Sequence, residues 1–71
     1  MDITLIVIPG PGARTVSLNT DTTVEALVVQ ENLHGRDIII NGRGVPPTEY
    51  STTIVPTNAE VFATGSVKGN S

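Results

Sequence analysis

Cysteine is absent from this 71-residue chain, and its aromatic residues are limited to Tyr50 and Phe62. Without cysteine, the chain has no disulfide bonds, no thiolate metal ligands and no cysteine nucleophile. With so few aromatic rings, it has no platform on which nucleic-acid bases would stack. A domain of about this size buries only about 60% of its unfolded surface, so packing or a partner must supply its stability.

Basic residues are also few, and they are scattered along the chain: Arg14, Arg36, Arg43 and Lys68. They form no basic stripe that would displace counterions from a phosphate backbone, so nucleic acid is not an expected partner. The longest apolar run, residues 5–8, is far shorter than the ~20 residues of a membrane span, and no basic leader region precedes it. We expect a soluble, unsecreted protein of the cytoplasm or of a virion, with no membrane partner.

Hydrophobic content of 38%, mean hydropathy of +0.11 and a formal charge of −3 are typical of a folded chain. We expect one domain over residues 1–67 and a short tail at residues 68–71. Residues 3–8 are β-branched and almost wholly apolar, which predicts a strand, and Pro9-Gly10-Pro11-Gly12 ends it. Residues 14–18 alternate polar with apolar side chains and predict the second strand of a hairpin.

The next segment changes its period from two to that of a helix. Thr22 is followed three residues later by Glu25, which is the capping-box pattern of a helix N-terminus. A helix of roughly ten residues is expected, with one face formed by Val24, Leu27, Val28 and Glu31. Asn32 and Gly35 provide left-handed positions for its end, and Leu33 is expected to return onto the core.

The second half of the chain is expected to return to the sheet. Residues 37–41 predict a strand bounded by Asn41-Gly42, a pair preferred in tight turns with positive φ. Gly44 and Pro46-Pro47 predict irregular structure after it. Three further elements are expected: a helical turn at residues 48–50, a strand-like segment at 52–55 and the last strand at 60–64.

This order of elements predicts an α+β fold, a mixed sheet of four or five strands with one helix packed on one face. Strand alternation assigns nine residues to the face beneath the helix: Ile3, Leu5, Val7, Val16, Leu18, Ile38, Ile40, Val61 and Ala63. The same alternation assigns Ile6, Ile8, Ile39 and Phe62 to the opposite face. Together these four side chains would form a patch on the order of 300 Å², a size at which a functional surface becomes reasonable. The alternative is that loop residues or the segment around Tyr50 cover part of this patch.

Other candidate sites have simpler explanations. His34 is the only histidine; it has neither the convergent ligands of a metal site nor a nucleophile placed beside it, so a solvated loop residue is expected. The glycine-rich turns lack the spacing of a phosphate-binding loop. Arg43, at the tip of a turn, is expected in solvent or against an acidic partner, and it joins the predicted interface. We expect no enzyme activity, no metal and no cofactor.

Four segments of the chain, taken in order and spacing, point to one family: residues 19–27, Ile40-Asn41-Gly42 with Val45-Pro46, residues 49–55, and residues 58–61 leading into a tail of small residues. Together they resemble the ubiquitin-like β-grasp domains, in particular thiamine-type sulfur carriers and the small subunit of molybdopterin synthase. The resemblance covers residues 14–69 and implies the β-grasp fold.

In that family a terminal Gly-Gly carries the activity, because a partner enzyme adenylates its carboxylate, which then becomes a thiocarboxylate. Residues 68–71 read Lys-Gly-Asn-Ser here, so only Gly69 matches, and only after processing. The leading hypothesis is therefore a non-catalytic interaction or structural module, such as a capsid decoration protein, held in an assembly through its apolar sheet face and its chain ends. The expected partner is another protein, with a capsid shell or a second copy of the chain as examples. The alternatives are a carrier or modifier activated at Gly69 by an adenylating enzyme, and an accessory domain that regulates a larger enzyme.

Overall fold

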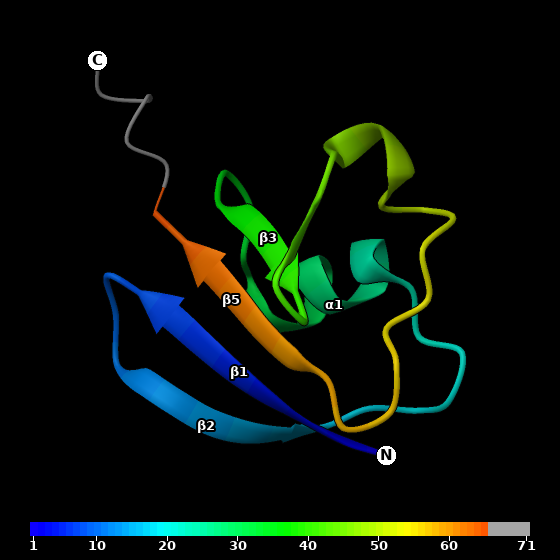
Figure 1. Cartoon of the computed structure of the whole chain (residues 1–71), viewed down its shortest axis with the longest axis horizontal. Helices are drawn as coiled ribbons and strands as arrows, with labels where there is room; N and C mark the ends of the chain where they lie inside the picture. The colour runs from blue at the N-terminus through cyan, green and yellow to red at the C-terminus, as the bar shows by residue number, and fades with distance from the viewer. Residues whose placement is uncertain (66–71) are drawn as a thin grey trace.

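The computed structural model describes residues 1–65, which form one sheet crossed by one α-helix (Figure 1). Its elements are β1 (Asp2–Ile8), β2 (Gly12–Ser17), α1 (Val24–Glu31), β3 (Asp37–Ile40), β4 (Arg43–Val45), the short 3₁₀ helix η1 (Pro47–Glu49) and β5 (Glu60–Thr64). The five strands lie in the order β2-β1-β5-β3-β4. The β1–β5 pair is parallel and the other pairs are antiparallel, so the mixed α+β fold is confirmed. The predicted boundary between domain and tail lies outside the described residues.

The core lies between α1 and one face of the sheet. All nine sheet residues that alternation assigned to this face are buried. The helix contributes Val24, Leu27 and Val28, and Leu33 closes the core after the helix ends. Val55 and Ala59, which the strand pattern did not single out, complete it from the segment before β5.

The helix begins one residue later than the capping-box pattern predicted. Thr23, not Thr22, is the N-cap, and its side chain accepts a hydrogen bond from the Ala26 backbone N–H at 3.1 Å. This shift places alanine at the third helical position, so Glu25 cannot close a capping box. The Thr22 hydroxyl instead donates to the Asn19 carbonyl in the preceding loop.

A neighbouring segment explains why the helix starts there. The Val24 N–H donates to the Thr53 carbonyl at 2.9 Å, and the Glu25 N–H donates to the Tyr50 carbonyl at 3.0 Å. With the Thr23 cap, these bonds satisfy the N–H groups that the first turn of a helix leaves without a partner. The helix start is thus tied to residues 50–53. Its other end follows the prediction, with Asn32 left-handed at φ 56° and Gly35 at φ 81°.

Two predictions for the second half of the chain are wrong. Residues 43–45 form the edge strand β4 rather than irregular structure, because the turn at Asn41-Gly42 places Arg43 opposite Ile40. Residues 52–55 form no strand and make one isolated bridge, Ile54 with Thr23, because this segment pairs with the start of the helix and not with the sheet. Within residues 1–65, no helix combines the length and apolar character needed to cross a membrane.

Thr23→Ala is expected to lower the free energy of unfolding by about 1 kcal/mol, because it removes the side chain that caps the helix. Thr22→Ala is the matched control and is expected to cost less, since that hydroxyl bonds only within an exposed loop. Urea titration followed by circular dichroism measures both. A larger loss from Thr22→Ala would place the cap where the sequence pattern put it.

Leu27→Ala is expected to lower the free energy of unfolding by ~2–5 kcal/mol, because Leu27 is fully buried and the change leaves a cavity. Val29→Ala, on the same helix, is the control: Val29 is 63% exposed, so its truncation should change stability by no more than about 0.5 kcal/mol. Equal effects of the two variants in thermal and urea unfolding would contradict the position of the core.

Candidate functional site

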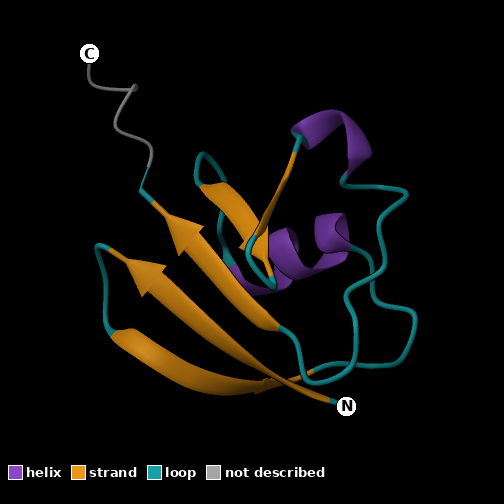
Figure 2. Cartoon of the chain, in the orientation of Figure 1, coloured by secondary structure: helices purple, strands orange, loops and turns teal. Residues whose placement is uncertain are grey.

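The sheet face opposite α1, called the open face below, has no element packed over it among residues 1–65 (Figure 2). The register places thirteen residues on it: Asp2, Thr4, Ile6, Ile8, Ala13, Thr15, Ser17, Asp37, Ile39, Gly44, Glu60, Phe62 and Thr64. None of them is buried. The fold therefore leaves a whole side of the sheet available for contact.

Three of the predicted interface residues lie side by side at the centre of this face. Phe62 is the register partner of Ile6 on one side and of Ile39 on the other. Adjacent strands are about 4.8 Å apart, so the three side chains form a continuous apolar row and partly shield one another. Ile8 lies two residues further along β1 and is 48% exposed. The structure thus brings together all four apolar residues of the predicted patch.

Small residues end the apolar row at both edges of the sheet. Ala13 lies beside Ile6 on β2, and Gly44 lies beside Ile39 on β4. A Cβ atom added at Gly44 would meet no atom within 4 Å. The row is therefore a ridge of three large side chains between two low, accessible edges. The pairing register between strands identifies Ala13 and Gly44 as the ends of the row. The sequence of each strand taken alone did not indicate these two positions.

The loop that carries Tyr50 does not cover this ridge. Tyr50 packs against the core cluster, on the side of the sheet that α1 occupies. The alternative in which this loop hides the patch is therefore wrong, because the hydrogen bond from Glu25 to the Tyr50 carbonyl fixes the loop beside the helix.

Charge divides unevenly between the two faces. The open face carries the carboxylates of Asp2 and Glu60, and within residues 1–65 no lysine or arginine occupies a strand position on it. Asp37, the first residue of β3, lines the pocket that contains Tyr50. Arg14 is the register partner of buried Leu5 and therefore projects on the helix side, where its guanidinium binds Glu31 at 2.6 Å. The open face is thus apolar at its centre and acidic toward one end of its strands.

Arg43 is not part of this surface. It is the register partner of buried Ile40, so its side chain lies on the helix side of β4 and is exposed there. The structure does not bring Arg43 together with the four apolar residues, because the two-residue turn sets which face it occupies. Gly69, the predicted carrier terminus, lies outside the described residues.

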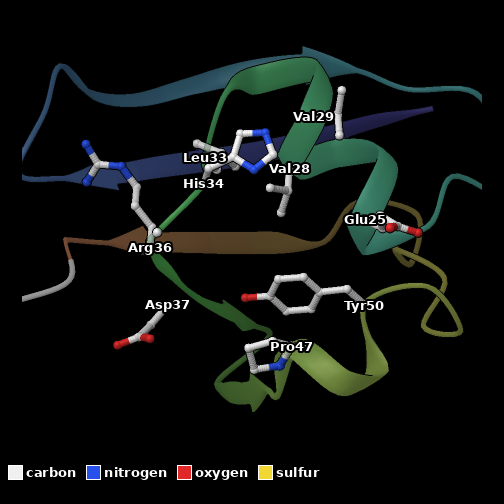
Figure 3. A pocket seen from close by; sticks show the side chains of 10 residues that line it. Glu25, Val28, Val29, Leu33, His34, Arg36, Asp37, Pro47 and Tyr50 are labelled. Carbon is white, nitrogen blue, oxygen red and sulfur yellow. The ribbon is translucent and has the colours of Figure 1, made fainter. Parts of the chain in front are cut away.

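A pocket of about 540 Å³ lies between α1 and η1 on the helix side. Tyr50 and Pro47 form one wall, and Val28, Leu33 and His34 form the other (Figure 3). Burial raises the pKa of the Tyr50 hydroxyl above its ordinary value, and the negative charge of Asp37 adds to this effect. The phenol therefore stays neutral at physiological pH.

His34 is exposed at the rim of this pocket. Within residues 1–65, no three histidine, aspartate or glutamate side chains are grouped so that they could hold a metal ion. The absence of catalysis, of a metal and of a cofactor stays a prediction.

The Tyr50 pKa gives a testable pH dependence. Tyr50 is the only tyrosine, so its phenolate absorbance reports one group, and its midpoint in the folded protein is expected above that of the urea-unfolded chain. Because the folded-state pKa is raised, this group's contribution to stability is complete below about pH 10 and is lost as pH rises through the unfolded and then the folded pKa. Asp37→Asn is expected to lower the folded midpoint only in part, since burial is the larger cause. Coincident midpoints for folded and unfolded chains would contradict the environment of Tyr50.

No protein-family model matches this sequence, and no curated protein matches it either. The resemblance to ubiquitin-like sulfur carriers therefore stays a prediction.

Proposed function

We propose that this chain is a non-catalytic interaction module that binds a protein partner through the open face of its sheet. The observation that carries the proposal is the apolar row of Ile6, Phe62 and Ile39, which lies at the centre of a face with no buried residue. Contiguous apolar surface of this kind is a frequent mark of contact sites in folded domains. A pleated sheet face is also flatter than the concave sites that enclose small ligands, which favours a macromolecular partner.

The charges around the row indicate the chemistry of the partner. Asp2 and Glu60 are both acidic, and they lie toward the same end of the strands, beside the row. Interfaces place complementary charges around an apolar centre. The proposed partner surface therefore carries aliphatic or aromatic side chains at its centre and lysine or arginine at its rim.

The proposal includes a setting for the domain, which is a larger assembly in the cytoplasm or in a virion, with capsid decoration as one example. The mixed sheet with a single helix supports the ubiquitin-like relationship as part of the same proposal. The carrier alternative depends on Gly69 and an adenylating enzyme. It stays a prediction, because that residue lies outside the part of the chain that the structure describes.

Phe62→Ser is expected to weaken partner binding strongly while the domain remains folded, because Phe62 is at the centre of the row and outside the buried core. The immobilised chain would first recover the partner from an extract of its source, and the purified pair would then be titrated by calorimetry. Loss of a central aromatic contact should weaken binding ~30-fold or more.

Ile54→Ser is the matched control, since Ile54 is 46% exposed and lines a second pocket with Arg43, which projects on the helix side of the sheet. It should bind as the parent chain does. Equal weakening by both variants, or unfolding of the Phe62→Ser domain in a circular dichroism melt, would exclude the open face as the contact surface.

A further inference from the structure

The two edges of the sheet differ in how well they are protected from pairing with another strand. β4 has three residues and is followed by Pro46-Pro47, which have no N–H groups to donate. β2 has six residues, contains no proline or lysine, and pairs with β1 residue for residue without a bulge. Folded proteins normally block a free edge with proline, lysine or a bulge. The β2 edge has none of these, and its one charged side chain, Arg14, is paired with Glu31. No strand lies along its outer side among residues 1–65 (Figure 2).

The hydrogen bonds at one end of β2 show which of its backbone groups point outward. Met1 and Leu18 exchange both of their bonds, each at 2.7 Å, which makes them a hydrogen-bonded pair. Such pairs alternate along an antiparallel ladder, so Val16, Arg14 and Gly12 direct their backbone groups to β1. Ala13, Thr15 and Ser17 therefore direct their N–H and C=O groups away from the sheet.

The three residues that point outward also share one face. Ala13, Thr15 and Ser17 project on the open face, and all three side chains are small. When two identical antiparallel strands pair about a two-fold axis, the residue at the centre faces its own copy, and residues at equal distances on its two sides face each other. Thr15 lies midway between the other two, so centring the pair on Thr15 lets all three outward-pointing residues form hydrogen-bonded pairs.

We propose that β2 pairs with β2 of a second copy, antiparallel and centred on Thr15, to form a continuous ten-stranded sheet from two five-stranded ones. Thr15 then lies opposite Thr15 of the second copy, and Ala13 lies opposite Ser17 of the second copy. Threonine pairs stabilise such positions through packing and hydroxyl hydrogen bonds. Both helices lie on one side of the joined sheet, and both open faces lie on the other. This inference holds independently of what the open face binds.

The electrostatics of the edge also fit a second copy. Arg14 is the only charged residue in β2, and Glu31 of the same chain already neutralises it at 2.6 Å. In the proposed register Arg14 lies opposite Val16 of the second copy, not opposite another arginine. No uncompensated charge therefore enters the joint, and like charges do not face each other directly across it.

A single introduced cysteine tests this register, because the chain has none of its own. Thr15→Cys should form a disulfide-linked dimer under mild oxidation, since a hydrogen-bonded pair has Cα atoms about 5.5 Å apart and disulfides need about 4.4–6.8 Å. Thr4→Cys is the matched control. Thr4 is exposed beside Thr15 on β1, yet in the joined sheet the two Thr4 residues are three strand spacings apart, about 14 Å.

Sedimentation equilibrium with charged variants provides the second arm. The parent chain should dimerise, and Thr15→Lys or Thr15→Glu alone should weaken the dimer ~5-fold by placing like charges opposite each other. Mixing the Lys and Glu variants should restore association as a heterodimer. A parent chain that stays monomeric up to millimolar concentration would overturn the proposal. So would equal disulfide formation by Thr15→Cys and Thr4→Cys, or failure of the mixed variants to associate better than either alone.

Discussion

The architecture depends on one constraint, which is that a single short helix can bury only one side of a five-stranded sheet. Strands pack by alternation, so every apolar residue that falls on the wrong parity projects away from the helix. In the three central strands those residues include Ile6, Ile39 and Phe62, and the register places them in one row. Residues 1–65 contain no further element that covers them. The open face is therefore a direct product of the strand sequences.

The segment between η1 and β5 stabilises the fold without adding a strand. Its carbonyls at Tyr50 and Thr53 accept hydrogen bonds from the first turn of α1, and Val55 enters the core. The same contacts hold Tyr50 beside the helix, where it forms a wall of the pocket next to η1. One stretch of irregular chain thus fixes the start of the helix and keeps its own aromatic residue away from the open face.

Alternation along the strands was enough to predict the sheet core and the opposite apolar patch, because each depends on a local period. The predictions that were wrong concern features that depend on contacts between residues far apart in the sequence. The helix starts at Val24 because the carbonyls of Thr53 and Tyr50 accept hydrogen bonds from its first two N–H groups. No local sequence pattern contains that information. The face of Arg43 likewise follows from its pairing with Ile40. Asn41-Gly42 is a strong hairpin signal, so β4 was within reach of sequence reasoning.

The domain has two surfaces that are available for contact, the open face and the β2 edge, and their charges differ in how well they would allow two copies to associate. Stacking open face on open face would bring the carboxylates of Asp2 and Glu60 toward their counterparts, and within residues 1–65 the strand positions of that face carry no basic residue to offset them. Like charges across an interface oppose association. The β2 edge carries a single charge that is already paired. Electrostatics thus direct self-association to the edge and leave the open face for a partner of opposite charge.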